Sequence, residues 1–201
     1  MTTLTSDEAS AIEQRRKRHI LRVVAKVVAE EGFSGATMRK IAERAGVSTG
    51  MLTYYYKNKR ELLQDMLAAT YAGFVRDLGQ IIGDEPGPER IQAAFQVMFN
   101  GQSSGRFPIS FWLSYFAEAI RDGELREASV RGILRLREVF RSAIASGKET
   151  GEVRDDVDAE AIADLFMVMW QGLRVQVGLY EMPEERASDV VIQTLRLLRP
   201  R

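Results

Sequence analysis

Apolar residues recur along most of the chain with the spacing of amphipathic helices, and no run alternates apolar and polar positions as a half-buried strand does. Glycine and proline mark most of the breaks between these periodic segments. The pattern predicts an all-α protein. Helices are expected at about residues 11–31, 38–45, 49–55, 59–82, 89–100, 108–121, 124–146, 158–179 and 184–198.

Three polar side chains in the first third of the chain are placed to cap helix starts. Thr37 and Ser48 each precede a short helix, and Asn58 with Glu61 three residues later forms the pattern of a capping box. Gly46 supplies a turn between the two short helices, which is the arrangement of a helix-turn-helix. In that motif the N-terminal residues of the second helix meet base edges in the major groove. Because short helix pairs are common, the pattern alone leaves DNA binding as a hypothesis.

The charge distribution favours this hypothesis. Lys and Arg number 28, as do Asp and Glu, but the first 60 residues hold 12 basic against 6 acidic residues, and the rest holds 16 against 22. A basic head on an acidic body is typical of a head that binds a polyanion, although chance would also produce it. Tyr54–Tyr56 lie beside Lys57 and Lys59, and both residue types often contact phosphates. Core packing is the alternative for the tyrosines, and is expected for Tyr56.

Several function classes lack the residues they need. Cysteine is absent and His19 is the single histidine, so no disulfide, metal site or other cofactor is expected. The chain has no phosphate loop and no nucleophile elbow, which argues against an enzyme. The polar segment Met1–Ser10 has no signal-peptide core, and no apolar run is long enough to span a membrane. We therefore expect a cytoplasmic protein, with a helical adaptor that does not bind DNA as the remaining alternative.

The segment between Thr37 and Leu63 contains a dense set of motif residues. They are Thr37, Ile41-Ala42, Ala45-Gly46-Val47-Ser48, Gly50, Tyr55-Tyr56, Lys59 and Leu62-Leu63, preceded by Gly32-Phe33 and Ala36. As a set they resemble the DNA-binding region of the TetR family of bacterial regulators, over roughly residues 15–65. Thr53 departs from the pattern, because the family often has tyrosine there, so a contact at Thr53 is expected to differ.

The resemblance implies a function and a set of DNA contacts. It implies a repressor that binds a double-stranded DNA operator as a homodimer and is released by a small-molecule effector of unknown identity. Phosphate contacts are expected from Thr37, Ser48 and Lys59, with Arg39 contacting phosphate or solvent. Base contacts are expected from Thr49, Gly50 and Thr53. Packing against the sugar-phosphate strand is expected from Tyr54 and Tyr55.

The rest of the chain is expected to receive the signal. Residues 1–57 are predicted to form the helix-turn-helix DNA-binding domain, and residues 58–201 a larger helical domain for ligand binding and dimerisation, connected by the helix that begins near Asn58. The segment Gly83–Pro88 is the clearest break within the larger part. The stretch Phe111–Val130, with the arginine-rich helix after it, resembles the C-terminal domain of the BetI-like subgroup, which is named for a choline-responsive repressor but binds varied ligands.

Aromatic residues and methionines in the body either fill a core or line a cavity. Core packing is the commoner outcome, and an apolar cavity with a few polar groups is the functional alternative. The candidate ligand contacts are Phe95, Phe99, Trp112, Tyr115, Phe116, Glu118, Met167, Trp170, Gln171 and Arg174. A narrower hypothesis is an aromatic cage of Trp112, Tyr115 and Trp170 around a quaternary ammonium.

The last two helices carry broad apolar stripes that suggest a dimer interface. The stripe residues are Ile162, Leu165, Phe166, Met169, Leu173 and Val177 on one helix, and Val190, Val191, Leu195 and Leu198 on the other. The predicted interface residues among them are Ile162, Phe166, Met169, Leu173, Val177, Val191, Leu195 and Leu198. Two copies would pair these helices into a four-helix bundle, and a helix-turn-helix protein usually binds two half-sites. The alternative is that both stripes face only their own subunit.

Overall fold

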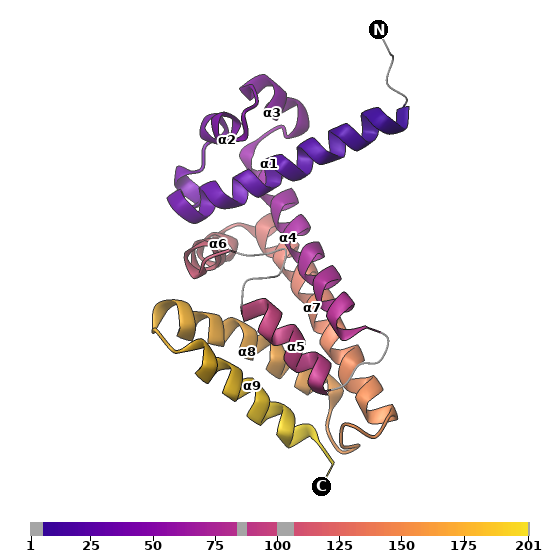
Figure 1. Ribbon diagram of the computed structural model, residues 1–201. Coiled ribbons are helices and arrows are strands. Elements are labelled where there is room, and N and C mark those ends of the chain that lie inside the picture. Colours follow the sequence, from indigo (N-terminus) through magenta and orange to yellow (C-terminus); the bar gives the residue numbers. More distant parts are fainter. Residues whose placement is uncertain (1–5, 84–87, 100–106, 201) are drawn as a thin grey trace. The chain divides into compact units, whose positions relative to one another are not determined.

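A computed structural model describes residues 6–83, 88–99 and 107–200, and every regular element within these ranges is a helix (Figure 1). The helices are α1 Ser6–Gly35, α2 Met38–Ala45, α3 Thr49–Tyr55, α4 Lys59–Ile82, α5 Pro88–Phe99, α6 Ile109–Arg121, α7 Gly123–Glu149, α8 Ala159–Leu179 and α9 Glu184–Leu198. The predicted all-α class is confirmed. Predicted boundaries agree within one helical turn except at α1, which begins earlier and continues past a bend at Gly32, where φ is 72°.

The chain forms two compact units. The head unit comprises the residues up to Ala69 together with Ser110–Ala128, and the body unit comprises Thr70–Ile109 together with the residues from Ser129 on. α6 and the start of α7 are thus part of the same compact unit as the helix-turn-helix. The predicted functional domains, 1–57 and 58–201, divide the chain at a different point and stay a prediction.

The core of the head unit follows the periodicity of its helices. Ile20 and Val24 of α1 are fully buried, as are Ile41 of α2 and Leu52 of α3. α2 packs against α1, and α3 packs against α2 (Figure 1). Burial of one apolar face on each short helix stabilises a pair that would not be helical in isolation.

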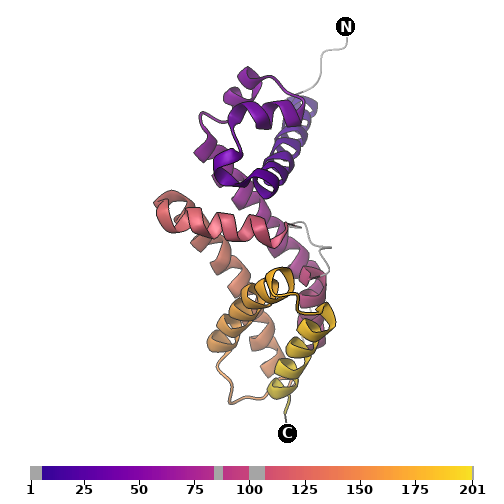
Figure 2. The ribbon, with the colours of Figure 1, turned by 90° about the vertical axis from the view of Figure 1, so that its left-hand side faces the viewer.

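Large aromatic side chains fill the body unit. Phe95 of α5, Phe140 of α7 and Phe166 of α8 meet with ring centroids 5.4–5.5 Å apart. α9 packs against both α5 and α8, which lie close to it in both views (Figures 1 and 2). A Cβ atom at Gly132 of α7 would lie 2.3 Å from the Tyr71 ring of α4, so glycine is what lets α4 and α7 approach there. Within the described ranges, no helix combines the length and apolar character needed to cross a bilayer.

Candidate functional site

The turn between α2 and α3 has the two caps that the sequence predicts. Thr37 Oγ1 accepts from the Lys40 backbone N–H at 3.3 Å, and Ser48 Oγ accepts from the Met51 N–H at 3.1 Å. Gly46, with φ of 65°, ends α2 in the left-handed region. The earliest amides of α3 have no carbonyl of their own helix to bind, so they are suited to meet phosphate at this helix start.

One face of α3 is exposed and made of small or hydroxyl-bearing side chains. Thr49, Gly50 and Thr53 are exposed, and Tyr54 is 81 % exposed, while Leu52 anchors the opposite face in the core. Thr53 Oγ1 donates to the carbonyls of Thr49 and Gly50, at 3.1 Å and 3.0 Å. Its proton is therefore used within the helix, and Thr53 would offer a base its oxygen lone pairs or its methyl group.

The three tyrosines have different environments. Tyr54 and Tyr55 meet edge to face with centroids 5.3 Å apart, and the Lys17 ammonium lies 5.7 Å from the Tyr55 ring centroid. Tyr56 is buried, and its hydroxyl donates to Asp65 Oδ2 at 2.9 Å. Burial, together with the nearby Asp65 carboxylate, raises the pKa of Tyr56 well above its usual range. The core prediction for Tyr56 is confirmed, and DNA packing by Tyr54 and Tyr55 stays a prediction.

Lys59, predicted to bind phosphate, has a contact within the protein. Its Nζ donates to the Phe33 carbonyl oxygen at the bend of α1, and burial lowers the pKa of the ammonium. The predicted cap before α4 forms, with Asn58 Oδ1 accepting from the Glu61 N–H at 3.0 Å. In a standard capping box the Glu61 carboxylate would accept from the N–H of Asn58. Here it accepts from the N–H of Lys57, one residue earlier, at 2.8 Å. Phosphate binding by Lys59 stays a prediction beside this structural role.

Two contacts across the helix pair were not foreseen from the sequence. His19 is exposed, and its Nε2 lies 3.2 Å from the carbonyl oxygen of Ala45, the last residue of α2. Lys17 lies against Tyr55, which brings a residue of the basic run Arg15–Arg18 next to α3. The two residues are 38 positions apart, so the sequence pattern does not indicate their contact. Arg39 is exposed on α2 as expected.

Part of the predicted ligand set lies on α6 in the head unit: Trp112, Tyr115, Phe116 and Glu118. Trp112 and Tyr115 are buried. The Tyr115 ring stacks on Phe33 with centroids 5.9 Å apart, and its hydroxyl donates to the Leu125 carbonyl at 3.3 Å. The Trp112 ring meets the Tyr115 ring edge to face with centroids 6.2 Å apart, so both residues are part of the head core, and a ligand role for them stays a prediction.

The remaining predicted ligand residues belong to the body unit: Phe95, Phe99, Met167, Trp170, Gln171 and Arg174. The side chain of Phe99 lies outside the described part of the structure. Trp170 is buried, with the Phe74 ring edge-on at 5.4 Å and the Arg174 guanidinium 5.8 Å from its ring centroid. Arg174 Nη2 donates to the Phe107 carbonyl at 2.6 Å, and burial lowers the pKa of Arg174 to about 10. A half-buried cation thus lies against the Trp170 ring in this unit.

Most of the predicted dimer stripe is covered within the single chain. Five of its residues are buried within the single chain: Phe166, Leu173, Val191, Leu195 and Leu198. They pack against their own subunit, whereas Ile162, Met169 and Val177 are half-buried. The exposed apolar side chains on the same helices are Leu165, Val168 and Leu179 of α8 and Leu197 of α9. α8 is therefore apolar on two faces, one of which is exposed in the single chain.

Comparisons with known proteins agree with this architecture. Residues 87–200 match the family model for the C-terminal region of BetI-type transcriptional repressors, and residues 20–66 match that for bacterial regulatory proteins of the tetR family. The HTH-type transcriptional regulator BetI of Rhizobium meliloti is 27% identical over 182 residues, covering 90% of this chain and 87% of the relative. The HTH-type transcriptional repressor DhaR of Mycobacterium sp. is 25% identical over 190 residues, covering 89% and 91%.

Solved structures share the fold at lower identity. A transcriptional regulator from Saccharomonospora viridis in complex with choline has a TM-score of 0.81 and 19% identity, covering 94% of this chain and 100% of that one. The reduced form of Escherichia coli NemR has a TM-score of 0.79 and 19% identity, covering 92% and 98%. At these identities the likeness concerns the fold.

Proposed function

Because the chain belongs to the TetR family of bacterial regulators, with a BetI-type C-terminal region, it is a DNA-binding transcriptional regulator, and we propose that a small-molecule effector releases it from its operator in the cytoplasm. The observation that carries the DNA-binding mode is the exposed face of α3, where Thr49, Gly50 and Tyr54 stand free of the core. This face, with the start of α3 leading, is the part proposed to enter the major groove.

Operator binding is expected to be specific and to weaken with salt. Each phosphate contact releases counterions, so the affinity for the DNA upstream of the protein's own gene should fall steeply between low and moderate salt. Fluorescence anisotropy at two salt concentrations, with unlabelled competitor DNA, measures both properties. If no DNA binds even at low salt, the adaptor alternative replaces the regulator.

We infer that the regulator acts as a homodimer through the outer face of α8 and α9. Leu165, Val168 and Leu179 are exposed and recur at helical spacing, and Leu197 of α9 is 72 % exposed. An apolar stripe left open on one chain favours a self-complementary two-fold interface. Two heads held at a fixed separation would then bind two half-sites on one face of the DNA.

Release requires a connection between the effector and the heads. α4 is continuous from Lys59 in the head unit to Ile82 in the body unit, so a shift of its second half would move the head. We propose that the effector binds in the body unit and displaces α4, which changes the separation of the heads. The effector must bind the released form more tightly than the DNA-bound form, since equal affinity would shift nothing.

Choline is the first effector to test, because the Saccharomonospora viridis structure contains it. In this chain the Arg174 guanidinium already lies over the Trp170 ring, which is the position a quaternary ammonium would need. A second cation there would meet the charge of Arg174 in a buried environment. We therefore expect millimolar choline to leave operator affinity unchanged in the anisotropy assay. Release by choline that a Trp170→Leu variant abolishes would contradict this interpretation.

A further inference from the structure

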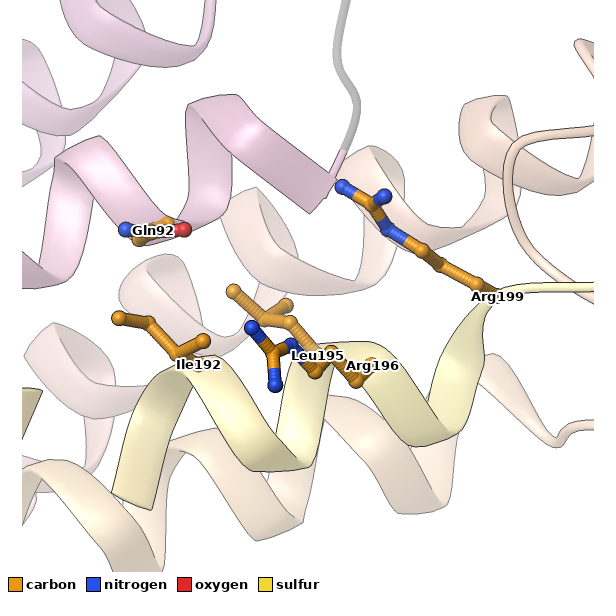
Figure 3. A pocket seen from close by; sticks show the side chains of 5 residues that line it. All are labelled: Gln92, Ile192, Leu195, Arg196 and Arg199. Atoms are coloured by element: carbon orange, nitrogen blue, oxygen red, sulfur yellow. The ribbon is translucent and has the colours of Figure 1, made fainter. Parts of the chain in front are cut away.

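A groove of about 170 Å³ lies between α5 and α9 in the body unit, apart from the buried aromatic core. It is lined by Gln92 of α5 and by Ile192, Leu195, Arg196 and Arg199 at the end of α9. Figure 3 shows Arg199 reaching from the end of α9 towards the beginning of α5, with Arg196 beside Ile192 and Leu195. Two arginines, an amide and two aliphatic side chains therefore border one small concavity.

The position of Arg199 is fixed by the backbone around it. The Arg199 N–H donates to the Arg196 carbonyl at 3.3 Å, and the Arg154 N–H donates to the Leu198 carbonyl at 2.9 Å. These bonds hold the last turn of α9 against the segment that precedes α8. The guanidinium group thus extends from a fixed backbone and is a better anion ligand than one on a fraying terminus.

The acidic partner of Arg199 is easily displaced. Glu89 Oε1 lies 3.5 Å from Arg199 Nη2, and the Glu89 side chain is 87 % exposed. An exposed pair of this kind contributes little to stability and is screened by salt. A carboxylate that also contacts Arg196 and Ile192 would compete with Glu89 for Arg199.

The size and lining of the groove define a ligand class. A cavity of about 150 Å³ holds benzene, and arginine binds carboxylates through paired N–H donors. Ile192 is half-buried beside the buried Leu195, so Ile192 offers an aliphatic contact for a flat or branched carbon group next to the two guanidinium groups. We propose that this groove binds a small organic monocarboxylate, with Arg196 and Arg199 on the carboxylate and Ile192 under the carbon skeleton.

The alternative explanation for the two arginines is structural: they stabilise the C-terminus of α9, where cations interact favourably with the helix dipole. That role needs no ligand and predicts no binding. It would also leave the concavity and the amide of Gln92 opposite the arginines without a function. Direct titration separates the two explanations.

The test is calorimetric titration of the full-length protein with benzoate, a probe that has both required features. Wild-type protein is expected to bind benzoate, and to bind benzamide, which has the same shape without the charge, at least tenfold more weakly. Arg196→Gln and Arg199→Gln should each weaken benzoate binding about tenfold, the loss expected for a hydrogen bond to a charged group. Arg186→Gln, an exposed arginine at the other end of α9, is the matched control and should bind as wild type does.

Thermal unfolding of each variant, compared with wild type, shows whether the chain is folded before titration. The proposal is overturned if benzoate does not bind, if benzamide binds equally well, or if both groove variants keep wild-type affinity. In the last case the ligand occupies another site, and the arginines are helix-terminal charges only. Operator binding is measured separately, so neither result depends on the DNA-binding proposal.

Discussion

Replacing Val168 by arginine is expected to convert the protein from a dimer into a monomer and to weaken operator binding by about a hundredfold or more. Val168 is 67 % exposed on the outer stripe of α8, between Leu165 and Leu179. A two-fold interface would bring both copies of the new charge into an apolar contact, where an unpaired charge is costly. The effect on DNA is large because a linked pair of weak heads gains about 10²–10⁴ in affinity over a single head.

Light scattering after gel filtration measures the mass, and anisotropy on the operator measures the affinity. Gln80→Arg adds the same charge at an exposed position of α4 and should change neither. Unfolding temperatures should be compared at a concentration where wild type is dimeric, because dimerisation itself raises stability. A Val168→Arg protein that stays dimeric would place the interface elsewhere on the chain.

The difference between the predicted and the exposed stripe shows a limit of periodicity. Spacing of three and four residues identifies a buried face but not the molecule that covers it. Phe166 and Leu173 have that spacing and pack inside their own chain, whereas Leu165 and Val168, one and two positions from Phe166, are exposed on another face of the same helix. On a helix that is apolar on two faces, both stripes show the same residue spacing in the sequence. Only the packing of the folded chain shows which stripe is buried and which is exposed.

The helix-turn-helix was predictable because its determinants are local. Ser48 caps the backbone N–H of Met51, three residues later, and Gly46 directly follows Ala45, the last residue of α2. The contacts of Lys59 with Phe33 and of His19 with Ala45 each join residues 26 positions apart. Their partners are backbone carbonyls, which leave no trace in residue identity, so no sequence pattern could indicate them.

The aromatic residues of the predicted ligand set were the least predictable part of the site. Composition cannot distinguish a ring that fills a core from one that lines a cavity, since both need large apolar groups. Tyr115 is held by Phe33, from a helix more than 80 residues earlier, and by the Leu125 carbonyl. The charge on Arg174 was visible in the sequence, but its burial against Trp170 depends on how α8 packs in the body unit.

Replacing Gly50 by alanine is expected to stabilise the free protein slightly while weakening operator binding about tenfold or more. A Cβ atom at Gly50 would meet nothing closer than Ser48 Oγ at 3.9 Å, so the fold has room for it. Alanine is favoured over glycine within a helix by up to about 1 kcal/mol, and less near a helix start. We therefore attribute the glycine at this exposed position to close approach of the DNA, because glycine lets a ligand contact the backbone closely.

The opposite signs of the two effects make Gly50→Ala a sensitive test of the DNA interface. A methyl group between the start of α3 and the DNA would lengthen backbone contacts to phosphate, and a hydrogen bond to a charged group contributes about 1.5–3 kcal/mol. Gly79→Ala is the matched control, because Gly79 is exposed on α4 and its added Cβ would meet no atom within 4 Å. It should stabilise the protein with unchanged DNA affinity. If Gly50→Ala binds the operator as wild type does, the N-terminal turn of α3 does not approach the DNA backbone, and recognition must come from the exposed residues at its other end, Thr53 and Tyr54.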